Sequence, residues 1–176
     1  MTETGIAELV ASRLRDVPDF PIPGIVFKDI TPLLADAAAF AAVIRALAAT
    51  ADGAVDLVAG VEARGFLLAG AIARELDCGV VPVRKAGKLP PPTITRSYAL
   101  EYGTAELEVP VNILTGKRVL LIDDVLATGG TLKAAAELID QAGGTVTATA
   151  VLLELIFLGG RDVVAEIAPL TALLKV

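Results

Sequence analysis

Short apolar runs alternate along this chain with longer segments of helical character. Residues 6–15 carry apolar side chains at intervals of three and four, which predicts an amphipathic helix. Residues 37–50 are rich in alanine, the strongest helix former, and indicate a second helix. Further helices are predicted at residues 65–76 and 131–142, and short buried strands at residues 57–61, 80–83, 119–122 and 145–154.

Strands that alternate with helices of ten or more residues are typical of an α/β fold, with a central mostly parallel sheet flanked by helices on both faces. We expect one domain over residues 1–176, with ligands bound at the carboxyl ends of the strands. Residues 84–110 interrupt the alternation with a proline run followed by spaced tyrosines and leucines. They indicate a hairpin or flap, since long loops of this kind often act as lids.

Two other segments carry patterns that need interpretation. Residues 20–34 are rich in proline and broken by Gly24, so we expect an ordered connection with an exposed aromatic side chain, Phe27. Residues 151–158 are apolar except for Glu154 and are interpreted as buried strand. The chain is 55% hydrophobic, yet no apolar run approaches the roughly twenty residues of a membrane helix.

The charge and the rare residue types exclude several classes of function. A net charge of −6 disfavours a nucleic-acid-binding protein, although the basic cluster Arg84, Lys85, Lys88 and Arg96 suits a small anionic substrate. With one cysteine and no histidine, an intramolecular disulfide, a zinc cluster and a histidine-based triad are all excluded. Residues 1–9 lack the pattern of a secretory signal, so a cytoplasmic location is expected.

The most informative segment is VLLIDDVLATGGTLKAAAELI at residues 119–139, in which an apolar strand leads through two acids and a glycine turn into a helix. Glycines at such a turn let backbone amides converge on an anion, and the helix start adds further amides and a favourable dipole. The acids could accept hydrogen bonds from ribose hydroxyls. The candidate ribose 5-phosphate residues are Asp123, Asp124, Ala127, Thr128, Gly129, Gly130 and Thr131.

A simpler interpretation of this segment is a tight turn with helix-capping acids. It does not match the GxxxxGK[ST] loop of nucleoside triphosphate binders or the GxGxxG of dinucleotide folds. The combination of strand, paired acids, small-residue loop and helix resembles the 5-phosphoribosyl 1-diphosphate signature of type I phosphoribosyltransferases.

Four further motifs extend this resemblance to the adenine-specific members of that family. They are FPIPGIVFKDITPLL, GVEARGFLLAGAIA, VRKAGKLP and SYALEYGTAELE, which occur in the family's order between residues 20 and 161. The resemblance implies the type I phosphoribosyltransferase fold, with a flap over the active site. It also implies transfer of 5-phosphoribosyl to adenine, giving AMP and diphosphate in purine salvage, with Mg²⁺ held mainly by the substrate rather than by direct protein ligands. Homodimers are common in the family.

The resemblance also assigns roles to individual residues. Phe27 would stack on adenine while the backbone of Val26 and Lys28 reads its edge, and Glu101 in the flap would be the acid–base residue near purine N7 or N9. Diphosphate contacts are implied for Glu62, Ala63, Arg64, Arg84, Lys85, Lys88 and Tyr102, with a cis peptide expected between Glu62 and Ala63. Lys28 stands where many members carry arginine, which matters little if only its backbone reads the base.

Two alternatives remain open at this stage. The acceptor could be another base, such as hypoxanthine, guanine, xanthine or orotate, because the donor signature does not specify it. The chain could also be a regulator that binds donor or purine without turnover. Such regulators usually add a DNA-binding module or a basic RNA-binding face, and neither is visible here.

Overall fold

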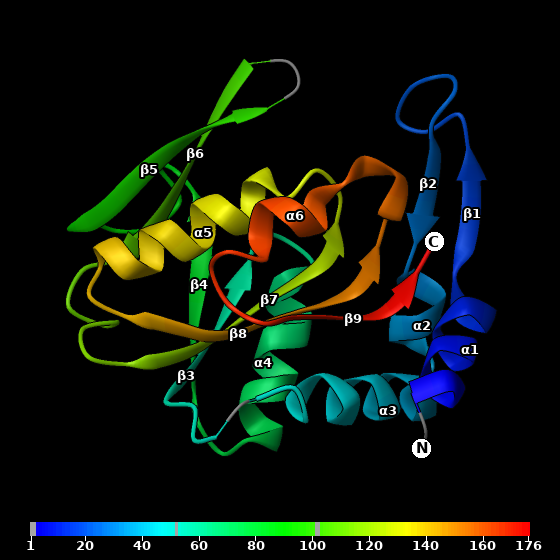
Figure 1. Ribbon diagram of the computed structural model, residues 1–176, viewed down its shortest axis with the longest axis horizontal. Coiled ribbons are helices and arrows are strands. Elements are labelled where there is room, and N and C mark those ends of the chain that lie inside the picture. Colours follow the sequence, from blue (N-terminus) through cyan, green and yellow to red (C-terminus); the bar gives the residue numbers. More distant parts are fainter. Residues whose placement is uncertain (1–2, 52, 101–102) are drawn as a thin grey trace.

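The computed structural model describes residues 3–51, 53–100 and 103–176, and within them the fold centres on a seven-stranded sheet (Figure 1). The strand order is β5-β6-β4-β3-β7-β8-β9. Five strands are parallel to one another, namely β3 (Leu57–Val61), β4 (Gly79–Lys85), β7 (Arg118–Leu126), β8 (Thr145–Glu154) and β9 (Leu170–Lys175). The predicted α/β class with a mostly parallel sheet is confirmed.

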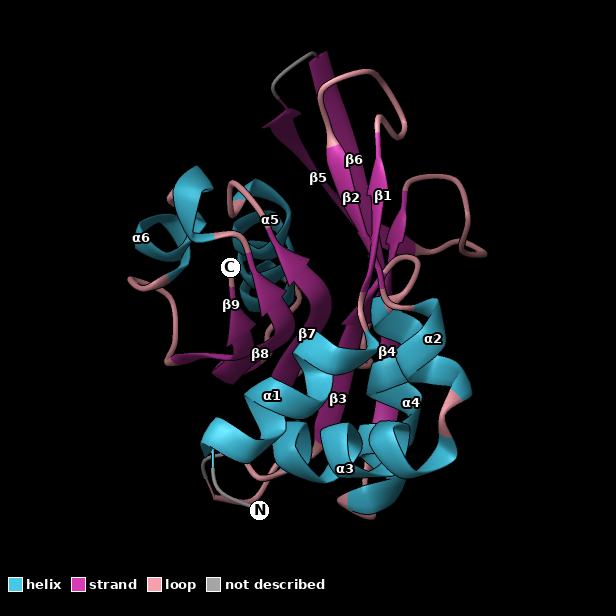
Figure 2. Cartoon of the chain, turned by 90° about the vertical axis from the view of Figure 1, so that its right-hand side faces the viewer, coloured by secondary structure: helices cyan, strands magenta, loops and turns pink. Residues whose placement is uncertain are grey.

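Helices cover both faces of this sheet (Figure 2). One face packs against α1 (Glu3–Arg13), α2 (Thr31–Ala35), α3 (Ala37–Ala48) and α4 (Gly65–Glu75), and the other against α5 (Gly130–Gln141) and α6 (Gly160–Val164). Strand β7 shows why the sequence requires two layers. Its side chains alternate, so that Leu120 and Ile122 enter one core while Val119 and Leu121 enter the other. A strand buried on both faces therefore reads as a continuous apolar run.

The predicted flap is a hairpin of β5 (Thr93–Leu100) and β6 (Gly103–Pro110), which pairs antiparallel to the end of β4. The prediction of a hairpin within residues 84–110 is confirmed. A second hairpin, of β1 (Arg15–Pro18) and β2 (Val26–Asp29), projects from the same side of the molecule, toward which the parallel strands run (Figures 1 and 2). The carboxyl ends of the parallel strands thus lie between two projecting hairpins.

The β1–β2 hairpin corrects the interpretation of residues 20–34 as a connection. Arg15 pairs with Asp29 and Lys28 with Asp16 across the two strands. The prolines between the strands indicated a plain connection, so this pairing was not predicted from the sequence. Helix α1 consequently ends at Arg13 rather than at residue 15. Phe27 is partly buried rather than exposed, because its ring packs edge-on against Phe20.

The end of β8 corrects a second interpretation. The strand stops at Glu154, and residues Ile156–Leu158 form the 3₁₀ helix η1, in which Phe157 is 76% exposed. The physical reason lies in the neighbours, because both β7 and β9 make their last pairing opposite Glu154. Within the ranges that the structure describes, no helix combines the length and apolar character needed to cross a membrane.

Candidate functional site

Two buried carboxylates lie at the carboxyl end of β7. The pairing of β3 with β7 ends at Ile122, and β7 runs on through Asp123 and Asp124 to Leu126. Both residues are less than a tenth exposed, and Asp123 Oδ1 accepts a hydrogen bond of 2.8 Å from the Asp124 amide. Burial, and then the neighbouring Asp124, raise the pKa of Asp123 well above its usual value.

Gly65, the first residue of α4, lets that helix approach the acid pair. A Cβ at this position would lie 3.2 Å from Asp123 Oδ1 and 3.1 Å from the Ile122 carbonyl oxygen. The amino end of α4 therefore faces Asp123, and the positive end of the helix dipole favours a negative charge there. The Asp123 carboxylate is thus held between the end of a strand and the start of a helix.

The predicted phosphate loop joins β7 to α5. Gly129 precedes the first helical residue, Gly130, and has φ of 85°, a left-handed conformation that glycine adopts without strain. The first four amides of any helix lack partners inside it, so α5 presents donors to this loop. The loop of Ala127, Thr128 and Gly129 leading to Thr131 therefore has the backbone geometry of an anion site.

Gly160 packs against the backbone of this loop. Its role was not identified from the sequence. A Cβ on Gly160 would lie only 2.0 Å from the Ala127 carbonyl oxygen and 2.8 Å from the Gly129 nitrogen. The start of α6 is therefore in direct backbone contact with the phosphate loop, which excludes any side chain at position 160. The Gly159–Gly160 pair was the one sequence signal that could have pointed to it.

Arg64 connects Phe27, the residue predicted to stack on the base, to the acid pair Asp123 and Asp124. Its guanidinium carbon lies 5.1 Å from the centroid of the Phe27 ring, and its Nη2 lies 2.7 Å from Asp124 Oδ2. The second contact is an ion pair outside hydrogen-bond geometry, which leaves the buried Oδ2 without a hydrogen-bond partner among the described residues. The Phe20 ring meets Phe27 edge-on at a centroid distance of 5.3 Å.

The turn after β3 contains the expected cis peptide between Glu62 and Ala63. Glu62 Oε2 accepts hydrogen bonds from Arg84 Nε at 3.2 Å and from the Lys85 amide at 3.0 Å. Burial raises the pKa of Glu62, but these two donors outweigh it and leave the pKa below its ordinary value. Glu62 and Arg84, both predicted to bind diphosphate, are thus in contact.

The other residues predicted to bind base or diphosphate lie in β2 and in the flap region. The Lys28 ammonium turns toward Asp16 at 2.8 Å, which leaves only its backbone in β2 for a base, and Val26 of the same strand is half exposed. The Lys88 carbonyl oxygen accepts from Arg84 Nη1 at 3.1 Å. Glu101 and Tyr102 lie outside the described residues.

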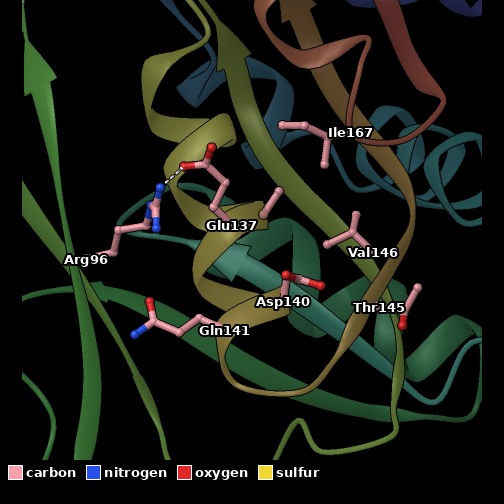
Figure 3. A pocket seen from close by; sticks show the side chains of 8 residues that line it. Arg96, Glu137, Asp140, Gln141, Thr145, Val146 and Ile167 are labelled. Carbon is pink, nitrogen blue, oxygen red and sulfur yellow. Dashed lines mark ion pairs between the residues drawn. The ribbon is translucent and has the colours of Figure 1, made fainter.

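The fourth cation of the basic cluster, Arg96, points elsewhere. Its guanidinium pairs with Glu137 of α5 at 2.6 Å, and both line a pocket of about 490 Å³ whose other lining residues come from α5, the start of β8 and Ile167 (Figure 3). Arg96 belongs to the basic cluster of the sequence but not to the residues expected to bind diphosphate, and β5 carries its side chain to α5. The pocket contains none of the predicted site residues. Within the described ranges, no group of three or more metal-ligating side chains is present.

Comparison with known proteins gives consistent matches along the chain. A model of the phosphoribosyl transferase domain matches residues 28–158. Adenine phosphoribosyltransferase of Mycobacterium avium (strain 104) is 58% identical over 176 residues, which cover 97% of this chain and 96% of that protein. The adenine phosphoribosyltransferase structure from Rhodothermus marinus DSM 4252 is 44% identical with a TM-score of 0.93, and covers 98% of this chain and 99% of that one.

A third similar structure carries ligands. Adenine phosphoribosyltransferase of Saccharomyces cerevisiae was solved in complex with D-2,5-dideoxy-2,5-imino-altritol 1,6-bisphosphate and adenine. It is 36% identical, covers 97% of this chain and 99% of its own, and superposes with a TM-score of 0.89. Both the sequence and the backbone of this chain are therefore similar to these enzymes over nearly the full length.

Proposed function

This chain belongs to the phosphoribosyltransferase family, and on that premise we propose that it transfers the 5-phosphoribosyl group of 5-phosphoribosyl 1-diphosphate to adenine. The products are AMP and diphosphate, and the reaction serves purine salvage. The observation that carries the proposal is the chain of contacts from Phe27 through Arg64 to Asp124. An aromatic ring, a cation and a buried carboxylate are in contact there, which supports a site that binds a base and a phosphorylated sugar together.

Each part of the site has a task in binding the donor. The amides around Gly129 and Gly130, with the Thr131 hydroxyl, hold the 5-phosphate, and Asp123 and Asp124 accept hydrogen bonds from the ribose hydroxyls. Arg64, Arg84, Lys85 and Lys88 neutralise the diphosphate, with Tyr102 beside it. Fixed donors aimed at a developing charge lower the barrier, because no solvent has to reorganise during the reaction.

Bond cleavage between ribose C1 and diphosphate leaves an oxocarbenium-like carbon, which N9 of adenine attacks. Phe27 stacks on the purine, and the backbone of Val26 and Lys28 reads its edge, so the base is positioned opposite C1. Glu101 accepts the proton that N9 gives up, in the proposed role of general base. Closure of the flap excludes water, which would otherwise hydrolyse the donor.

Mg²⁺ fits this site as an ion held mainly by donor oxygens and water. The buried Oδ2 of Asp124 accepts no hydrogen bond among the described residues, and such a hard oxygen suits a magnesium shell or a sugar hydroxyl. When bound, the ion would supply positive charge to the departing diphosphate.

We further propose that residues 1–176 form one catalytic domain with a flap at about residues 84–110, and that the protein acts as a cytoplasmic homodimer without nucleic-acid partners. The acid pair, the phosphate loop, the turn after β3 and the flap are all attached to the seven-stranded sheet, and the contact of Arg64 with Phe27 joins the β1–β2 hairpin to them, which supports the first point. Donor and product are multiply charged and do not cross a bilayer unaided, which supports an intracellular site of action. The family resemblance supports the dimer.

Parallel assays with donor and each base test the proposed acceptor. We expect AMP formation from adenine to exceed product formation from hypoxanthine, guanine, xanthine and orotate. Faster turnover of hypoxanthine than of adenine would overturn the adenine assignment. Binding of donor and base with no transfer would instead favour the regulator.

A further inference from the structure

Glu108 is a buried carboxylate to which the proposed mechanism gives no task. It lies on β6 with 3% of its surface exposed, and within the described ranges it forms no ion pair with a lysine or arginine. Buried carboxylates are costly unless paired or fully hydrogen-bonded, and an apolar side chain would fill the same space more cheaply. A specific partner is therefore needed to stabilise this carboxylate in the core.

That partner is the backbone of the loop between β4 and β5. Glu108 Oε1 accepts hydrogen bonds from the Lys88 amide at 2.6 Å and from the Leu89 amide at 2.7 Å. Burial raises the pKa of Glu108, but the amides of Leu89, Lys88 and Gly87 with the Thr93 side chain outweigh it and lower the pKa overall. The carboxylate is therefore ionised at neutral pH, where its hydrogen bonds are strongest.

The backbone of Lys88 is fixed on both sides. Its amide is held by Glu108, and its carbonyl oxygen accepts from Arg84 Nη1 at 3.1 Å. Arg84 is in turn fixed by Glu62, which precedes Ala63 and Arg64 in the turn after β3. A continuous set of contacts thus links the buried carboxylate of the flap strand to the turn proposed to bind diphosphate.

We propose that Glu108 is a positioning residue of the donor site, which holds the backbone of Lys88 so that its ammonium group meets the diphosphate. The inference rests on the proposed function of the site. Glu108 touches neither substrate; it acts through Lys88 and, by way of the Lys88 carbonyl, supports Arg84. Its contribution therefore falls on donor and diphosphate binding rather than on adenine.

The test compares Glu108→Gln with Glu106→Gln, two residues earlier on the same strand. Glu106 is exposed and contacts Ser97 Oγ at 2.7 Å, so this variant controls for loss of one negative charge from β6. We expect Glu108→Gln to raise the KM for donor about tenfold and to weaken binding of inorganic diphosphate by a similar factor, since hydrogen bonds to a charged group are being weakened. The KM for adenine and kcat should change less than twofold, and Glu106→Gln should match the unmodified protein.

A second variant perturbs the loop and leaves the Glu108 side chain unreplaced. Gly87 is exposed and has φ of 79°, and a Cβ added to it would meet nothing within 4 Å, so Gly87→Ala strains only the loop backbone. The same donor-specific rise in KM is expected. This variant decides the question if Glu108→Gln fails to fold.

The outcomes separate the two proposals. If the unmodified protein makes no AMP, the proposed function fails, while the comparison of diphosphate binding still tests Glu108. Equal diphosphate affinity in the unmodified protein, Glu108→Gln and Gly87→Ala overturns the positioning role. So does an equal loss for both substrates, and absence of diphosphate binding by the unmodified protein overturns both proposals.

Discussion

The guanidinium of Arg64 lies over the ring of Phe27, with its central carbon 5.1 Å from the ring centroid. The two residues come from different elements, since Phe27 is in β2 and Arg64 caps α4. A cation at this distance is attracted to the aromatic face by about 0.5–2 kcal/mol. The contact brings the projecting β1–β2 hairpin to the carboxyl end of the sheet, where Asp124 pairs with the same arginine.

Replacing Phe27 tests the base platform. We expect Phe27→Ala to raise the KM for adenine by about 5- to 150-fold, because stacking of a base on an aromatic ring contributes about 1–3 kcal/mol. Phe27→Tyr keeps the aromatic face and should stay within a few-fold of the unmodified protein. Steady-state kinetics with each substrate varied in turn gives both KM values. A loss confined to the donor KM would contradict the assignment.

Replacing Gly160 tests the support of the phosphate loop. The Cβ of Gly160→Ala would lie 2.0 Å from the Ala127 carbonyl oxygen, so the loop backbone has to move. We expect donor affinity to fall at least about tenfold, since misplacement of a positioning group is costly.

Gly70→Ala is the matched control for that prediction. Gly70 lies in α4 with open space around its Cα, and alanine there should stabilise the helix by about 0.5–1 kcal/mol and leave the donor KM unchanged. Isothermal titration with 5-phosphoribosyl 1-diphosphate measures the affinity of both variants. Equal donor binding by Gly160→Ala and the unmodified protein would show that the loop does not depend on this contact.

Replacing Asp123 tests the electrostatics of the acid pair. Burial and the adjacent Asp124 raise the pKa of Asp123 in the folded protein above its unfolded value of about 3.9. Stability linked to this group is therefore fully present below pH of about 3.9 and is lost as pH rises through the raised folded pKa. Asp123→Asn cannot ionise, so it removes this loss of stability at higher pH. Its side-chain oxygen can still accept the hydrogen bond from the Asp124 amide.

We therefore expect Asp123→Asn to be more stable than the unmodified protein at pH 7 by about 0.5–2 kcal/mol, as for other substitutions of functional residues. The difference in the free energy of unfolding should shrink as the pH is lowered toward 4, and donor affinity should fall. Urea unfolding at several pH values measures the difference. A stability difference that grows toward acid pH would show that the sign is wrong.

Replacing Glu101 tests the proposed proton transfer. Glu101→Gln keeps the size of the side chain and removes its basicity, so we expect kcat to fall about 10²- to 10⁴-fold while the KM for donor changes little. Rapid-quench measurement of a single turnover separates the chemical step from product release. An unchanged single-turnover rate would remove the residue from the mechanism.

The sequence predicted well those features that depend on residues close together in the chain. The apolar run of β7, the acids at 123 and 124, the Gly129 turn and the helix after it are one local pattern, and the structure has them in that order. The alternation of strands and helices likewise predicted the parallel sheet. Burial on both faces makes such strands read as apolar runs, which simple inspection recognises.

Contacts between distant residues could not be predicted in this way. Gly160 touches Ala127 across a strand and a helix, and Arg64 reaches Phe27 from another element. The β1–β2 hairpin was missed because its pairing of Arg15 with Asp29 spans a proline-rich loop, which by composition resembles a plain connection. Strand β9 was missed because it lies at the sheet edge, where none of its residues is fully buried.

The central claim is that the chain from β7 into α5 holds the 5-phosphate of a nucleotide while Asp123 and Asp124 hold the ribose. A crystal structure of the protein with AMP measures this most directly. The account predicts the phosphate against the amides of residues 128–131, the ribose hydroxyls within hydrogen-bond distance of the two aspartates and the purine on Phe27. AMP bound at any other place, with this loop left without phosphate, would contradict the account.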